Sequence, residues 1–175
     1  KTGLPAISVE KDFWVCWVLD KLFHLPTCGR ELTFKGGTSL SKGWQIIDRF
    51  SEDIDIVINK GILGFDGEKS PEQAPTPSQE KKRLKRLKKA SRQYIIDNLE
   101  PELRAAIKAE IDSDHPWQLE EDLEDPDRQT LLFTYPTAFP DADSYVKRIV
   151  KIEMGARSDT EPIEDIVVTP YISDT

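Results

Sequence analysis

The sequence holds few of the residues from which many common sites are built. Its 175 residues include two cysteines, two histidines and one methionine. Cys16 and Cys28 do not form a Cys-x-x-Cys pair, so we expect two free thiols and no cysteine-based metal or redox motif. The only histidines are His24, at the end of an expected helix, and His115, before a proline. This scarcity argues against a zinc site or a histidine-activated nucleophile.

Long apolar runs are also absent. No segment approaches the roughly 18 apolar residues that a membrane helix needs, and residues 1–5 lack the apolar block of a signal peptide. We therefore expect no membrane association and a cytoplasmic location. The chain lacks an initiating methionine and stops at Thr175 shortly after a strand-like stretch, so we expect a fragment of a longer protein.

Charge is unevenly distributed along the chain. The sequence has 24 lysines and arginines against 32 aspartates and glutamates, a net charge of −8, which argues against a uniformly basic nucleic-acid coat protein. Residues 80–92 contain eight basic residues and one acid, a net charge of +7, so the remainder carries −15. The hydrophobic fraction of 38% suffices for one ordinary core, which predicts one domain over residues 1–175.

Apolar periodicity predicts helices around a mixed sheet, that is, an α+β or α/β domain. Spacings of three and four predict a helix over 8–24 with Ser8 as N-cap, and strict alternation predicts a strand over 53–58. A glycine- and proline-rich segment predicts a flexible loop at about 60–79, and the acidic stretch 112–127 is expected to be irregular. Further strands are expected at 31–35, 129–135, 145–154 and 163–169. Further helices are expected after residues 36–38 and ending at about residue 47, at 79–98, and at 102–111, where Pro101 occupies a first-turn position.

A glycine-rich turn joins the expected strand at 31–35 to the next helix. Gly36 and Gly37 would let the backbone approach a phosphate closely, because neither has a Cβ atom. The hydroxyls of Thr38 and Ser39 and the free N–H groups of the new helix would bind the anion. Taken alone, the same residues also fit an ordinary tight turn.

Paired carboxylates follow in the strand at 53–58. Asp53 and Asp55 lie on one face of it, with Cα atoms roughly 6–7 Å apart, and can converge on divalent ions. Two such ions would orient an in-line phosphoryl displacement, and Glu153 offers a third carboxylate from another strand. Taken alone, the aspartates also fit a solvated strand end. We expect Lys151 to point away from Glu153 in a regular strand, and its role stays open.

Arg49 and Ser51 precede these carboxylates. Arg49 either binds a triphosphate or pairs with a neighbouring acid, and we favour the phosphate. The Ser51 hydroxyl is expected to support the turn, because no base lies beside it to make it reactive.

The basic segment 80–92 has two interpretations. Lys85, Lys88 and Lys89 could contact an RNA backbone. Alternatively, the helix is solvated, its leucines face the core, and the acidic stretch 112–127 balances its cations.

Several segments together resemble the AbiEii/AbiGii toxin family, nucleotidyltransferases of the DNA polymerase β-like superfamily. The most specific are residues 34–42 (FKGGTSLSK) and 49–55 (RFSEDID). Residues 10–13 (EKDF), 151–158 (KIEMGARS) and 169–172 (TPYI) are similar to the same family.

This resemblance implies a minimal nucleotidyltransferase fold, Mg²⁺ dependence and an NTP as co-substrate. It also implies the toxin of a bacterial toxin–antitoxin or phage-exclusion pair, with a cognate antitoxin encoded nearby and an RNA acceptor, since some relatives extend the 3′ end of tRNA. By this analogy Asp53, Asp55 and Glu153 bind the metal, and residues 36–39 hold the donor's phosphates. The alternative is a catalytically idle relative that binds nucleotide or a partner protein.

The sequence departs from the family pattern at its C-terminal end. Members usually continue into a helical region that supplies a lysine and a further acid to the active site. Since the given sequence stops at Thr175, we expect either a truncated chain or an incomplete activity.

Overall fold

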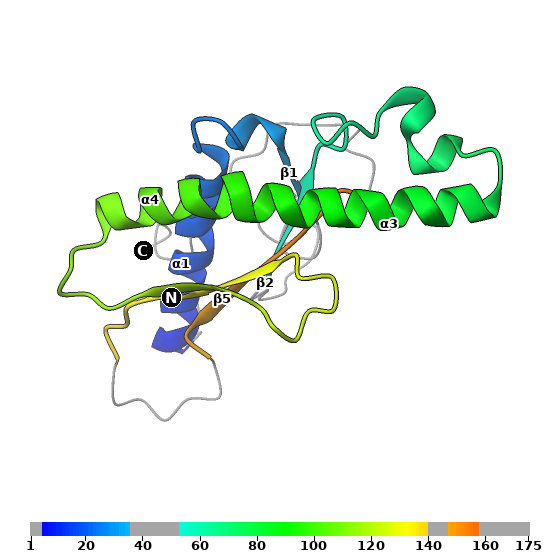
Figure 1. Cartoon of the computed structure of the whole chain (residues 1–175). Helices are drawn as coiled ribbons and strands as arrows, with labels where there is room; N and C mark the ends of the chain where they lie inside the picture. The colour runs from blue at the N-terminus through cyan, green and yellow to red at the C-terminus, as the bar shows by residue number, and fades with distance from the viewer. Residues whose placement is uncertain (1–4, 36–52, 140–146, 158–175) are drawn as a thin grey trace.

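A five-stranded mixed sheet forms the centre of the protein (Figure 1). The computed structural model describes residues 5–35, 53–139 and 147–157. The expected helix before residue 47 and the expected strand at 163–169 lie outside them. The strands are β1 (Leu32–Lys35), β2 (Asp53–Ile58), β3 (Gln118–Glu121), β4 (Thr130–Thr134) and β5 (Ile149–Gly155).

Among the described strands, one pair of neighbours is parallel. The strand order is β1-β2-β5-β4-β3; β2 and β5 run parallel, and the other neighbours are antiparallel. Together with the helices α1 (Ala6–Phe23), α3 (Pro77–Tyr94) and α4 (Glu100–Glu110), the sheet confirms the predicted α+β class. It is consistent with a minimal nucleotidyltransferase fold.

Helix α1 confirms the helix expected near the N-terminus, but the predicted N-cap is wrong. Pro5 occupies the cap position, and its carbonyl accepts hydrogen bonds from the backbone N–H groups of Ser8 and Val9 at 2.9 and 3.1 Å. The helix therefore begins one turn earlier than expected, and Ser8 is buried inside its first turn.

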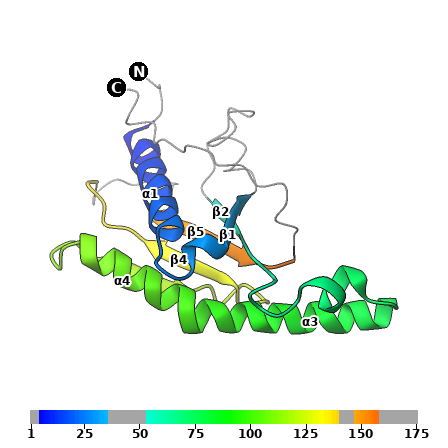
Figure 2. The same cartoon turned by 90° about the horizontal axis from the view of Figure 1, so that it is seen from above.

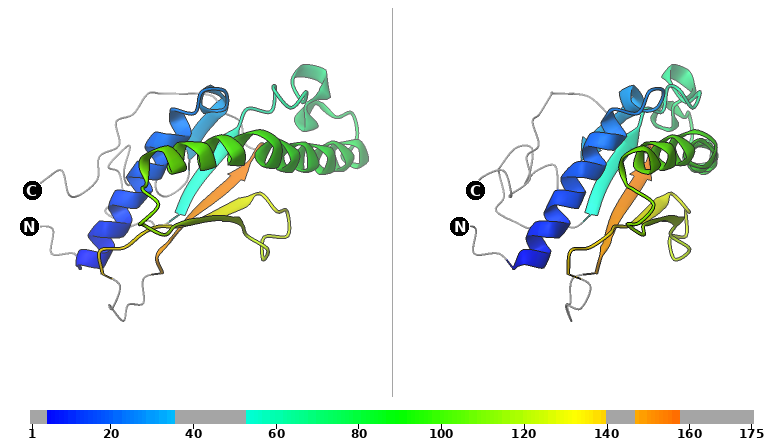
Figure 3. Two further views of the ribbon diagram at one scale, coloured as in Figure 1. Left: turned by 60° about the vertical axis from the view of Figure 1, so that its left-hand side comes forward. Right: turned by 90° about the vertical axis from the view of Figure 1, so that its left-hand side faces the viewer.

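Helices α3 and α4 form one long rod, joined by a π-helical turn over Ile95–Leu99. Figures 2 and 3 show the rod crossing α1. Pro101 lies in the first turn of α4, as expected from the sequence. Proline has no backbone N–H and cannot donate the regular helical hydrogen bond to the preceding turn. The change from α- to π-helical hydrogen bonding therefore lies directly before this proline.

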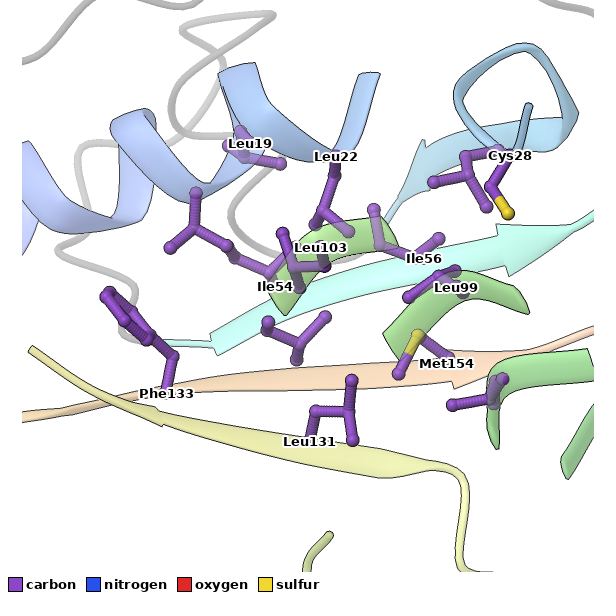
Figure 4. Close-up of a cluster of buried hydrophobic side chains, with 14 of the residues drawn as sticks. Leu19, Leu22, Cys28, Ile54, Ile56, Leu99, Leu103, Leu131, Phe133 and Met154 are labelled. Atoms are coloured by element: carbon purple, nitrogen blue, oxygen red, sulfur yellow. The ribbon is translucent and has the colours of Figure 1, made fainter. Parts of the chain in front are cut away.

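The core lies between one face of the sheet and the helices (Figure 4). Alternate residues of β2, β4 and β5 point into it, because successive side chains of a strand point to opposite faces. The side chains that meet there are Leu19 and Leu22 of α1, Leu99 and Leu103 of the rod, Ile54 and Ile56 of β2, Leu131 and Phe133 of β4, and Met154 of β5. Cys16 and Cys28 are buried and form no disulfide, as expected.

Two segments expected to lack regular structure contain short elements. The segment at 60–79 includes two 3-10 helices, Gly67–Lys69 and Pro71–Gln73, and the Arg83 guanidinium of α3 donates to the carbonyls of Glu68 and Ser70 at 2.6 and 2.8 Å. The acidic stretch contains β3, whose Leu119 is buried. The expectation of an irregular stretch over 112–127 was therefore wrong at β3.

The burial of the core predicts that two leucines differ in how much their substitution lowers the free energy of unfolding. Leu103 is fully buried, whereas Leu123 is 72% exposed. We expect Leu103→Ala to lower the free energy of unfolding by about 2–5 kcal/mol, because it removes buried methyl groups and leaves a cavity. Leu123→Ala is the matched control and should change it by less than ~0.5 kcal/mol. Urea denaturation followed by circular dichroism measures both, and equal losses would contradict the assigned core.

Candidate functional site

The face of the sheet opposite the helices carries the predicted acidic residues. In β2 the isoleucines enter the core, so Asp53 and Asp55 project from the other face, with Asp53 exposed and Asp55 half-buried. In β5 the same alternation places Lys151 and Glu153 on that face. Four charged residues of two neighbouring strands therefore share one surface.

The parallel pairing of β2 with β5 sets the order of these charges. Asp55 lies directly opposite Glu153, and Asp53 lies opposite Lys151. Adjacent strands are about 4.8 Å apart, so each pair is in close electrostatic range. The row through Asp55 continues on both sides, to Lys35 in β1 and to Thr130 in β4.

Lys151 forms an ion pair on this surface. Its Nζ lies 2.7 Å from Oε1 of Glu153, and the two side chains are 38% and 44% exposed. The hydrogen bond from Lys151 to Glu153 is the main reason that the pKa of Lys151 is raised. The expectation that Lys151 points away was wrong, because residues two apart in a regular strand lie on the same face.

The Asp55 carboxyl is held in an unfavourable environment for its charge. Burial raises its pKa, and the carboxylates of Glu153 and Asp53 raise it further, whereas Lys151 acts in the opposite direction. The ionised form of Asp55 therefore costs free energy in this fold. A bound cation would stabilise the ionised Asp55 carboxylate, because its charge would offset both the cost of burial and the repulsion by the neighbouring acids.

The donors on this face suit a hard divalent cation, since carboxylate oxygens are the ligands that Mg²⁺ prefers. Within residues 5–35, 53–139 and 147–157, however, no three acids, histidines or cysteines already stand close enough together to hold a metal ion. The structure brings Asp55 beside Glu153, while the Lys151 ammonium neutralises Glu153.

The other predicted site residues fall into two groups. Those expected to bind nucleotide lie outside the described residues: Gly36, Gly37, Thr38, Ser39, Arg49 and Ser51. The three expected RNA contacts lie on α3, where Lys85 and Lys89 are exposed and Lys88 is bonded to Asp127.

An acid-anchored turn supports the site from β4, and the sequence analysis missed it. One Asp125 oxygen accepts hydrogen bonds from the Gln129 N–H and the Thr130 hydroxyl, both at 2.8 Å, and the other accepts from the Asp127 N–H at 2.9 Å. Burial would raise the pKa of Asp125, but these hydrogen bonds outweigh it and lower the pKa. Thr130 is thereby fixed beside Glu153. The signal in the sequence was the Asp-Pro pair at 125–126, which is typical of a turn.

An open groove borders this surface. Asp53, Lys147 and Lys151 line one part of it, and it continues along the hairpin of β3 and β4 past Asp122 and Arg128. Of the three candidate acids, Asp53 lines this groove.

A protein family model matches most of the chain. The family model described as nucleotidyl transferase AbiEii toxin of the type IV toxin–antitoxin system matches residues 17–175. The chain belongs to this AbiEii toxin family. The resemblance based on residues 34–42 and 49–55 is confirmed, and membership implies a nucleotidyltransferase toxin with an antitoxin partner. Neither the curated proteins nor the solved structures give a match to this AbiEii chain.

Within the described parts of the AbiEii chain, no helix has both the length and the apolar character needed to span a bilayer.

The repulsion around Asp55 predicts that this residue destabilises the metal-free protein. A group with a raised pKa contributes less to stability as the pH rises through that pKa. We therefore expect Asp55→Asn to raise the free energy of unfolding at pH 7 in EDTA, within the ~0.5–2 kcal/mol typical of stabilising single substitutions. The gain should shrink as the pH is lowered and Asp55 becomes protonated. Urea denaturation at several pH values measures it, with Asp112→Asn, an exposed acid away from this face, as the control. A less stable Asp55→Asn variant would contradict this account.

The Asp125 turn predicts the opposite dependence on pH. Asp125→Ala should lower the free energy of unfolding at pH 7 by about 1–3 kcal/mol, because buried donors on Gln129 and Thr130 lose their acceptor. Since the pKa of Asp125 is lowered in the folded protein, its contribution is present above about pH 4 and is lost as the pH falls through the folded value. The comparison is with Glu124→Ala, an exposed acid of the same turn. Equal stability of the two variants at pH 7 would refute the anchoring role.

Proposed function

We propose that this chain is an Mg²⁺-dependent nucleotidyltransferase toxin that transfers a nucleotidyl group from an NTP to an RNA acceptor, with tRNA as the first candidate. Residues 1–175 would form its nucleotidyltransferase core. The observation that carries the proposal is the juxtaposition of Asp55 and Glu153 across β2 and β5, with Asp53 on the same face. Membership of the AbiEii family supports the reaction class.

In this proposal, Asp53, Asp55 and Glu153 would hold the divalent ion. Bound there, it would lower the pKa of the acceptor hydroxyl and neutralise charge on the α-phosphate and the departing pyrophosphate. The acceptor oxygen would bond to the α-phosphorus as its hydroxyl proton passes to solvent water. The bond between the α-phosphorus and the bridging oxygen would break, and pyrophosphate would leave with that electron pair.

The chain's own residues have distinct tasks in this reaction. Thr130 and the Asp125 turn keep Glu153 in register with Asp55. Lys151 balances the charge of Glu153 before the cation binds, which reduces repulsion in the resting site. The open groove beside Asp53 leaves room for the acceptor strand.

Substitution of single carboxylates tests the proposal. We expect Asp53→Asn or Glu153→Gln to lower transfer of label from an α-³²P-NTP to tRNA by more than ~100-fold, because loss of groups that merely orient metal ligands already costs 10–100-fold. Addition of EDTA to the wild type should have the same effect. Asp112→Asn should keep full activity, and circular dichroism checks that each variant is folded.

Two outcomes would contradict this mechanism. Full transfer by Asp53→Asn would remove the proposed metal site. Binding of NTP by the wild type without transfer to any RNA would instead favour an idle nucleotide-binding module of the same fold.

A further inference from the structure

Helix α3 has a strongly basic face that the rest of the described chain does not neutralise. Eight of its residues between 80 and 92 are lysine or arginine. Leu87 and Ser91 are buried against the sheet side of the protein, which fixes the outward direction of the helix. The residues that are exposed on the remaining surface and make no ion pair with any described residue are Lys81, Lys82, Lys85, Arg86 and Lys89.

The acidic stretch balances only the cations at the inner edge of the helix. Lys88 pairs with Asp127, and Arg92 pairs with Glu121 at 3.3 Å. Arg83 is used differently, since it donates to backbone carbonyls of the preceding segment. The interpretation in which residues 112–127 balance the whole basic helix therefore fails for the five outward cations.

These five cations form a compact stripe. Residues 81, 82, 85, 86 and 89 follow spacings of three and four, so they occupy one side of the helix. They span about 12 Å along its axis, since each residue rises 1.5 Å. One nucleic-acid strand carries a phosphate every ~3.4 Å of duplex axis, so the stripe matches three or four phosphates. In Figures 1 and 2 this part of α3 projects beyond the strands, where a large ligand can approach it.

The composition of the stripe favours a phosphate backbone over a protein partner. Protein interfaces depend on buried aromatic or apolar anchors, and their centres are depleted in lysine. The outward positions of α3 between Ser78 and Gln93 contain no large apolar side chain: Leu84 and Leu87 lie on the other side, and Ala90 is small and half-buried. Lysine and arginine without apolar anchors are typical of sequence-independent contacts to nucleic acid.

The candidate site offers a polyanionic acceptor little attraction before a cation binds. Its three acids outnumber Lys35 and Lys151 on the same face of the sheet, so the described charges there are negative in sum. An RNA acceptor then needs attraction from a separate cationic surface. The five cations of α3 provide such a surface within the same domain.

We infer that the outward face of α3, formed by Lys81, Lys82, Lys85, Arg86 and Lys89, binds the phosphate backbone of the acceptor RNA. The inference rests on the proposed function and assigns its acceptor a binding surface away from the chemistry. Lys88, which the sequence grouped with Lys85 and Lys89, is held by Asp127 and is not part of this surface.

Binding without catalysis tests this surface. Fluorescently labelled total tRNA is titrated with the protein by anisotropy, in EDTA and without NTP, at 0.05–0.3 M KCl. Lys85→Gln/Lys89→Gln is compared with Arg30→Gln/Lys108→Gln, which removes the same charge at two exposed positions elsewhere. We expect the first double variant to bind roughly tenfold more weakly at 0.15 M salt, with the slope of log K against log salt reduced by about 1.4–1.8, because two phosphate contacts are lost. The control should bind like the wild type.

Three results would overturn the inference: equal affinity and salt slope for the two double variants, no binding of tRNA by the wild type, or displacement of tRNA by polyglutamate of matched charge as effectively as by unlabelled RNA. The last result would indicate an acidic polypeptide as the natural ligand. The outcome is separable from the proposed function. Transfer to tRNA without a difference in binding would refute the surface alone, and a difference in binding without transfer would refute the reaction alone.

Discussion

The pairing of β2 with β5 is the constraint on which the rest of this structure depends. These two strands are the only parallel neighbours in the described sheet, and they are distant in sequence. Their register places Asp55 beside Glu153 and, on the other face, Ile54 beside Ile152 in the core. A slip of one residue would turn the acids into the core and the isoleucines into solvent. The same hydrophobic burial that stabilises the sheet therefore also fixes the carboxylates.

The protein accepts an electrostatic cost at this position. Asp55 is half-buried next to two other acids, and Lys151 relieves only part of the repulsion. Charged residues that lower stability in this way are typical of functional sites, where side chains are positioned to bind a ligand and not to stabilise the fold. The surrounding structure compensates with the cluster of buried hydrophobic side chains and with the hydrogen-bonded turn at Asp125.

The parts of the fold that sequence predicted are those with strong local periodicity. The alternation at 53–58 gave β2 with its bounds, and the apolar spacing gave α1. Strand β3 was missed because Gln118–Glu121 contains a single apolar residue and lies among acids. The pairing of β2 with β5 depends on contacts between segments almost 100 residues apart, which local patterns do not specify. Asp53, Asp55 and Glu153 could therefore be nominated from the sequence, but their register and the ion pair with Lys151 could not.

The separation of charge between α3 and the sheet has a consequence for how the molecule meets its ligands. One end of the protein carries a concentrated positive charge, and the bulk of the chain is negative, so the molecule is an electric dipole as well as a net anion. A dipole turns in the field of a polyelectrolyte before the two touch, and the torque decays over a Debye length of about 8 Å at physiological salt. Encounters with a nucleic acid are thus biased in orientation from the start. The basic part of α3 is therefore expected to face the nucleic acid first, with the acidic residues of the sheet turned away from it.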